Sequence, residues 1–141
     1  MYSHLQDPNY QKPFTVAQIE AAHQQVKTGA DFPQYIRNIK RLGVECFETF
    51  VIDSHTAYYA ADGYMAISEP QYDYLNISDQ IDKGMFIAYL QEHQQGKSNY
   101  FTFCEQCAAT GIQKWIVDLR KMTCTYYDKN NQEVLVEEIP V

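Results

Sequence analysis

The sequence predicts an α+β fold of two similar halves, each a pair of helices followed by strands, with the helices packed on a face of one or two antiparallel sheets. Three observations support this fold class. Hydrophobic residues recur at helical spacing in segments that begin with a capping residue and end with glycine. Elsewhere apolar and polar residues alternate with a period of two, as in strands. The order helix, helix, strands occurs twice in 141 residues.

The first half follows residues 1–13, which are polar and are expected to form a loose leader. In FTVAQI, Thr15 can cap a helix and Gln18 completes a capping box, which predicts a first helix that ends at Gly29. A second helix is expected over residues 31–43. VECFETFVID then alternates as a strand does, and HTAYYAADGYMAIS predicts two strands around an Asp-Gly turn. EPQYDYLNIS is compatible with a short strand or a loop.

The second half is expected to repeat this order. Ser78 or Asp79 should begin a third helix, which ends near Gly96. Asn99 should cap a fourth helix, which ends at Gly111. IQKWIVDL, MTCTYYD and EVLVEEI predict three further strands, with a turn at Lys-Asn-Asn between the last two.

A shift of the chain by 68 positions aligns the two halves without a gap. The shift places one capping residue, Asp31, on another, Asn99, and one helix stop, Gly43, on another, Gly111. Agreement of caps, stops and strand faces predicts an internal repeat. We therefore expect a single globular domain over residues 14–141, divided into halves at about 14–76 and 77–141.

Charge and composition argue against two classes of partner. The formal net charge of −7 disfavours nucleic acid, because binding to a phosphate backbone needs clustered Lys and Arg. The start of the chain lacks a signal-peptide pattern, and the longest apolar-leaning run, residues 85–90, is too short to span a membrane. Four cysteines without a secretory signal are expected as reduced thiols in a cytoplasmic protein. We expect no nucleic-acid or membrane partner, and no cofactor.

The stretch FCEQCAATG contains a Cys-x-x-Cys pair, Cys104 and Cys107. The shift by 68 positions places this pair on Ile36 and Ile39, on the apolar side of the corresponding helix. Free Cys behaves as a small hydrophobe and is often buried, so packing is the favoured interpretation.

Redox and zinc chemistry are the alternatives for the same cysteines. A reactive thiol is expected at a helix N-terminus, whereas Cys104 should lie a full turn inside its helix. A zinc site needs two more ligands, and Cys124 with His55 or His93 is the plausible completion. Cys104, Cys107 and Cys124 therefore remain the zinc or redox candidates.

The stretch DSHTAYY supplies the candidate ligand-binding residues Asp53, His55 and Tyr58. Asp53 could orient His55 as a base, with Tyr58 nearby as a donor, and loops between rigid elements often carry function. The structural alternative is that Asp, Ser and His are common turn residues that bond to the local backbone. Of the remaining histidines, His23 is expected in the core and His93 in solvent.

The segments FTVAQIEAAH, GADFPQYIRNIKRLGV, HTAYY, TFCEQCA and GIQKWIVDLRKMTCTYYDKNNQEVLVEEIP carry a family resemblance. Across residues 14–140 the chain resembles small bacterial proteins of unknown function that often bear the label "phage envelope protein". The resemblance implies a small α+β protein, sometimes carried on prophage-like elements, and implies no catalytic residues or cofactor. In that family the loop before the second strand often reads Asp-Gly-His-Thr. Ser54 occupies the glycine position here, where a positive φ is not expected.

A non-enzymatic binding or interaction protein is the function that these observations favour. No convergent catalytic set appears in the sequence, so we lean against an enzyme. The many strand tyrosines leave open an aromatic surface that joins two subunits as a homodimer, and no protein or small-molecule partner is identified. The alternative is a small thiol- or metal-dependent protein or enzyme that uses the cysteines or the Asp53–His55–Tyr58 loop.

Overall fold

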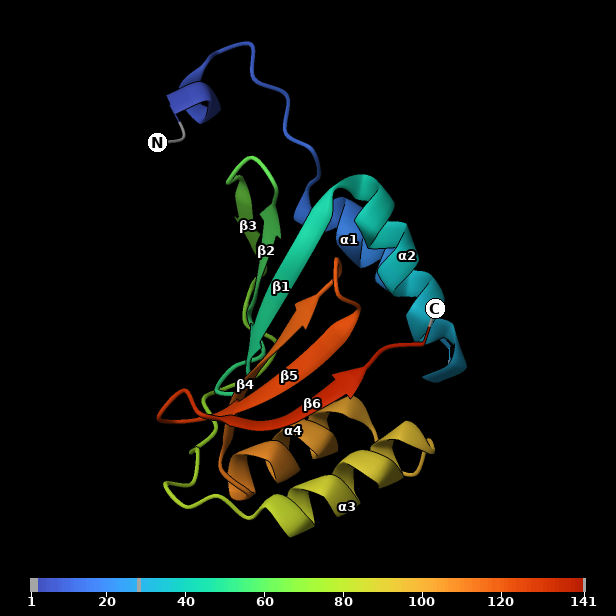
Figure 1. Ribbon diagram of the computed structural model, residues 1–141, viewed down its shortest axis with the longest axis vertical. Coiled ribbons are helices and arrows are strands. Elements are labelled where there is room, and N and C mark those ends of the chain that lie inside the picture. Colours follow the sequence, from blue (N-terminus) through green and yellow to red (C-terminus); the bar gives the residue numbers. More distant parts are fainter. Residues whose placement is uncertain (1–2, 28, 141) are drawn as a thin grey trace.

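A six-stranded antiparallel sheet in the order β3-β2-β1-β4-β5-β6 organises the chain in the computed structural model (Figure 1). The predicted α+β fold is confirmed. The structure describes residues 3–27 and 29–140, so the first two residues of the predicted leader, one residue of the predicted first helix and the last residue of the chain lie outside it. The elements are η1 Ser3–Gln6, α1 Val16–His23, η2 Gly29–Asp31, α2 Phe32–Leu42, β1 Val44–Phe50, β2 Thr56–Ala60, β3 Met65–Ile67, α3 Lys83–Gln94, α4 Tyr100–Ala109, β4 Ile112–Asp118, β5 Thr123–Asp128 and β6 Glu133–Glu138.

Capping geometry confirms most of the predicted helix ends. The Gln18 N–H donates to the Thr15 hydroxyl at 3.2 Å, and the Thr15 N–H donates to the Gln18 side chain at 2.9 Å, which completes the capping box of α1. Gly43 ends α2 with a left-handed φ of 113°. The Asn99 side chain accepts the N–H of Thr102 at 2.8 Å at the start of α4.

The predicted end of the first helix is wrong. α1 ends at His23 and does not continue to Gly29. The N–H groups of Gln25 and Val26 donate to carbonyl groups three residues back, so the chain tightens and leaves the α-helix. The Asp31 carboxylate also accepts the N–H of Lys27 at 2.9 Å, and this bond holds the connection between α1 and α2.

The predicted start of the third helix is also wrong. α3 begins at Lys83, where the Asp82 side chain provides the cap. The Ser78 hydroxyl instead accepts the N–H two residues later at 3.2 Å, which holds a local turn. Asp79 forms an ion pair with Lys129 at 2.5 Å. Both predicted capping side chains are therefore engaged elsewhere.

Both helix pairs cover the same face of the sheet (Figure 1). Trp115 of β4 and Tyr126 of β5 face each other across the two strands. The centroid of the Trp115 ring lies 6.1 Å from that of Phe103 in α4, and the centroid of the Tyr126 ring lies 4.9 Å from that of Phe86 in α3. Register places Tyr58 of β2 on this face as well, because Phe47 faces both Tyr58 and Val117. Tyr58 interacts with Tyr35 of α2. One face of the sheet thus forms the core with the helices.

The central strand pairing has an approximate two-fold arrangement. Glu48 of β1 faces Ile116 of β4, and these positions differ by the 68 residues that relate the halves. On either side of this pair, Phe47 faces Val117 and Thr49 faces Trp115. Trp115 is the equivalent of Phe47 and Val117 is the equivalent of Thr49, so the second pair is the first pair with the two strands exchanged. Irregularities in strand register lie at equivalent places too, between Val44 and Cys46 and between Ile112 and Lys114.

Within residues 3–27 and 29–140, none of the helices is both long enough and apolar enough to cross a membrane.

Candidate functional site

The structure brings Asp53 and His55 together at the end of β1. The His55 Nδ1 lies 2.6 Å from Asp53 Oδ1, and the same oxygen accepts the backbone N–H of His55 at 3.0 Å. Asp53 is buried, whereas His55 keeps 30% of its side-chain area exposed. The imidazole stacks on the Phe50 ring, with the two centroids 4.5 Å apart and an interplanar angle of 11°. Side-chain pairing, backbone pairing and stacking therefore all orient the ring.

The electrostatics of the pair fix the tautomer of His55. Burial raises the pKa of Asp53, but the hydrogen bonds from the backbone and side chain of His55 outweigh it, and the pKa lies below its ordinary value. An ionised carboxylate only accepts, so Nδ1 carries the proton and Nε2 is the acceptor of neutral His55. No residue that the structure describes forms a hydrogen bond with Nε2. The pair can accept a proton or bind a donor there.

Ser54 has a positive φ, although a serine in place of the family's glycine was not expected to adopt one. Its φ is 60°, a left-handed value that is uncommon outside glycine. The Ser54 hydroxyl lies 2.6 Å from the Tyr100 hydroxyl, and burial raises the pKa of Tyr100. This contact turns the serine side chain toward α4 and away from His55.

The segment that links the two halves closes over this loop. The N–H of Gln71 donates to the Asp53 carbonyl at 2.8 Å, and the Tyr72 hydroxyl donates to the Val51 carbonyl at 2.5 Å. The Tyr72 ring also contacts Phe101 of α4 at 5.1 Å. The backbone of the loop is therefore held from both sides, which explains how Asp53 and Ser54 become buried.

Tyr58, the third candidate ligand-binding residue, lies on the other side of the sheet. Its ring contacts Phe47 at 5.5 Å on the covered face, and its hydroxyl interacts with Tyr35 and Thr56. His55 is opposite Phe50, which lies three positions after Phe47 on β1 and therefore on the opposite face of the sheet. The structure thus joins Asp53 with His55 and leaves Tyr58 in the core.

The three candidate cysteines are buried thiols. Cys104 and Cys107 are 0% exposed and Cys124 is 8% exposed. Burial raises the pKa of all three, to about 12 for Cys124, which keeps them protonated and unreactive. No group of three or more His, Cys, Asp and Glu side chains in the described part of the chain has the geometry of a metal site.

Two further histidines, His23 and His93, exchange the environments expected for them. His23 is exposed, although its ring touches Tyr35 at 5.1 Å. His93 is half-buried, stacks on Phe103 at 4.5 Å and has Ser98 within 3.2 Å of Nδ1. Burial lowers the pKa of both imidazoles. Helical spacing misplaced His23 because α1 ends at that residue.

The face of the sheet opposite the helices, which we call the open face, consists of three rows of side chains. The central row runs across all six strands, from β3 to β6: Ile67, Ala57, Glu48, Ile116, Thr125 and Val136. The flanking rows are Met65, Tyr59, Cys46, Asp118, Thr123 and Glu138, and His55, Phe50, Lys114, Tyr127 and Glu133.

Large apolar side chains are exposed at both edges of the open face. Ile67 is 53% exposed, Met65 45% and Val136 51%. At the centre, Lys114 forms an ion pair with Glu48 at 2.8 Å, and each side chain is less than one-fifth exposed. The Lys114 ammonium also lies 5.4 Å from the centroid of the Tyr127 ring. The open face thus has exposed apolar edges around a largely covered ion pair.

The sequence suggested a binding surface on a sheet but could not predict which residues share the open face. Alternation separates the two faces of each strand, but it does not say which strands are neighbours. The row that joins Ile67 to Val136 requires the order β3-β2-β1-β4-β5-β6, and this order brings together residues almost 70 positions apart. The strand tyrosines were the signal in the sequence, and two of them, Tyr59 and Tyr127, lie on the open face.

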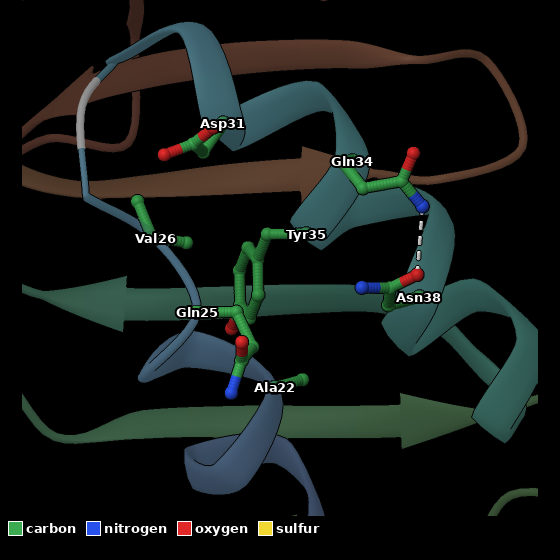
Figure 2. Close-up of a pocket in the computed structure, with 7 residues that line it drawn as sticks. All are labelled: Ala22, Gln25, Val26, Asp31, Gln34, Tyr35 and Asn38. Carbon is green, nitrogen blue, oxygen red and sulfur yellow. Dashed lines mark hydrogen bonds between the residues drawn. The ribbon is translucent and has the colours of Figure 1, made fainter.

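Two concave regions on the described part of the surface are small or shallow. Figure 2 shows a hollow of about 70 Å³ between α1 and α2, where the Tyr35 ring and the hydrogen-bonded pair Gln34 and Asn38 line the wall. A second depression, of about 310 Å³, lies along three cationic side chains of α2. Pockets for small ligands are usually about 300–1,000 Å³ and enclose most of the ligand. The 70 Å³ hollow is below that range, and the open depression is lined by one helix alone.

Fold and site together define a small α+β protein with one helix-covered and one open sheet face, and with an Asp–His pair at the border of the open face. The chain belongs to the family described as protein of unknown function (DUF1398), whose model matches residues 20–138. The comparison with curated proteins finds no match.

Proposed function

We propose that this protein is a non-enzymatic binding protein whose binding surface is the open face of the sheet. The observation that carries the proposal is the exposure of Met65, Ile67 and Val136 on one continuous face. Large apolar side chains that stay exposed on the same face of a sheet favour an interaction surface. The aromatic side chains of Phe50, Tyr59 and Tyr127, which lie between these edges, are of the kind enriched at protein interfaces.

Catalysis by Asp53 and His55 is the second candidate function, and the fixed tautomer of His55 is the observation in its favour. The nearest hydroxyl argues against it. Ser54 bonds to Tyr100 on the side away from His55, so the pair lacks an adjacent nucleophile. We therefore assign His55 to the border of the binding surface. A cytoplasmic location and a prophage association remain predictions, and neither enters this proposal.

Site-specific photocrosslinking in cells tests the proposal. A benzophenone amino acid at position 67 should form covalent adducts with a protein partner. The matched control is position 81, because Ile81 is also an exposed isoleucine, at 43%, and lies just before α3. Adducts that are several-fold stronger from position 67 than from position 81 support the open face. Equal yields from the two positions, or none from position 67, would overturn it.

A further inference from the structure

We propose that the partner of the open face is the open face of a second copy of this chain. In this dimer the two-fold axis runs parallel to the strands, between β1 and β4. The inference rests on the proposed function, because it names the partner of the same surface.

The central row of the open face is self-complementary about this axis. A two-fold axis along the strands keeps each row at its own level and exchanges the β3 edge of one copy with the β6 edge of the other. Ile67 of each copy then faces Val136 of the other, and the pair occurs twice, as in any isologous interface. These two side chains are the most exposed apolar groups of the open face, and they end the same row.

The charges of the open face favour the same orientation. The carboxylates Asp118, Glu133 and Glu138 lie on β4–β6, so the rotation places them over the β1–β3 half and not over each other. At the axis the Glu48–Lys114 pairs of the two copies come close together. Two opposite pairs related by a two-fold axis can alternate in sign, which offsets repulsion between chains of net charge −7.

The area of the open face matches a weak but specific dimer. Six strands at about 4.8 Å spacing and three rows over roughly 20 Å give about 600 Å² per copy. Two such faces bury roughly 1,200 Å² in total, which is the lower limit for specific interfaces. Two sheets packed face to face also form the core of β-sandwiches, at a separation of about 10 Å. The dimer should therefore dissociate reversibly in the micromolar range.

Sedimentation velocity of the full chain, over roughly 1 to 100 µM, tests the inference in the range where an interface of this size dissociates. The wild-type chain should shift from monomer to dimer. Ile67→Lys and Val136→Glu should each raise the dissociation constant about tenfold or more, because each charge faces an apolar side chain. The matched control Ile81→Lys should leave the dissociation constant unchanged, since Ile81 lies before α3.

Mixing the two variants tests the axis itself. In a mixed dimer the new ammonium of one copy faces the new carboxylate of the other, and the second contact keeps Ile67 against Val136. An equimolar mixture of Ile67→Lys and Val136→Glu should therefore dimerise more tightly than either variant alone. An axis across the strands would place Ile67 against Ile67 and Val136 against Val136. A mixed dimer would then contain no Lys–Glu contact, and its gain would be limited to the relief of repulsion between like charges. Both positions are more than half exposed, so the variants should fold, and circular dichroism checks this.

A wild-type chain that stays monomeric over the whole range overturns the inference. So does a dimer that persists in both variants, and so does a mixture without recovery. These results are separable from the crosslinking experiment. A monomer that still forms adducts from position 67 with another protein refutes the second copy and leaves the open face as the binding surface. A monomer without such adducts refutes both proposals.

Discussion

The two halves of the molecule share a backbone plan down to single residues. Six of the seven described residues with positive φ form three pairs that are 68 positions apart: a glycine after each second helix, a residue in the loop between the first two strands and a residue in the next turn. Gly96 is the seventh. The register irregularity in the first strand of each half is also matched. The pairs of positive φ are Gly43 and Gly111, Ser54 and Met122, and Gly63 and Asn131.

The chemistry of the matching loops differs. In the first half, Asp53 and Ser54 are buried and His55 is oriented. In the second half, Arg120 and Lys121 are exposed, and the Asp118 carboxylate holds their N–H groups at 2.9 and 3.0 Å. The difference arises from the connection between the halves, because the segment after β3 covers only the first loop. A shared backbone plan therefore does not give both halves the same site, and an internal duplication stays a prediction.

Core residues at equivalent positions should differ most in their contribution to stability. Ile39→Ala should lower the free energy of unfolding by about 4 kcal/mol, since Ile39 is fully buried and the change leaves a cavity. Cys107→Ala at the matching position should cost only about 1 kcal/mol, because it removes a single sulfur atom from a packed site. Urea denaturation of the two variants measures both values.

Equal losses in the two variants would contradict the packing role of Cys107 and would point to a bound group that the thiol holds. Ile36→Ala provides the control for the first half, because Ile36 is also fully buried on the same helix.

The two helix-ending glycines should also differ. A Cβ on Gly111 would lie 2.7 Å from the carbonyl oxygen of Gln80, whose backbone cannot easily move, and the φ is 91°. A Cβ on Gly43 would lie 3.2 Å from the Pro13 side chain. We expect a loss of about 3 kcal/mol for Gly111→Ala, and about 1 to 2 kcal/mol for Gly43→Ala, where the left-handed conformation is the main cost.

Thermal and urea unfolding of the two glycine variants measure this difference. A smaller loss at Gly111 than at Gly43 would mean that the segment before α3 adjusts freely and does not press against the second half.

Local signals predicted the scaffold well, because caps, glycine stops and alternation depend on neighbouring residues. Thr15, Gly43 and Asn99 act as the sequence indicates. The predicted start of the third helix failed because a distant partner intervened. Asp79 binds Lys129, which lies 50 positions away, and so does not cap α3. The Asp53–His55 pair was predicted because it is local, whereas the place of Tyr58 and the open face depend on strand order.

The pH dependence of stability should also differ between the two halves, and this is the smallest of the expected effects. Burial lowers the pKa of His93 below its ordinary value of 6.5, so the unfolded chain binds a proton more readily than the folded chain. The stabilising contribution of neutral His93 is complete above that value and is lost as the pH falls from it toward the folded pKa. Partial burial lowers the pKa of His23 as well, and we expect a smaller contribution from it because this residue is more exposed to solvent than His93. The folded pKa of Asp53 is also lowered, so its contribution is lost only as the pH falls below about 3.8 through that pKa.

Urea denaturation between about pH 7 and pH 5 measures the contribution of the histidines. The free energy of unfolding should decrease over this interval, and His93→Gln should flatten the decrease more than His23→Gln. Asp53→Asn should leave the slope of this interval unchanged and should alter stability below about pH 4, where the carboxylate titrates. A larger effect from His23→Gln than from His93→Gln would contradict the stacked, half-buried environment of His93 against Phe103. A slope that Asp53→Asn alone removes would contradict the assignment of this pH response to His93.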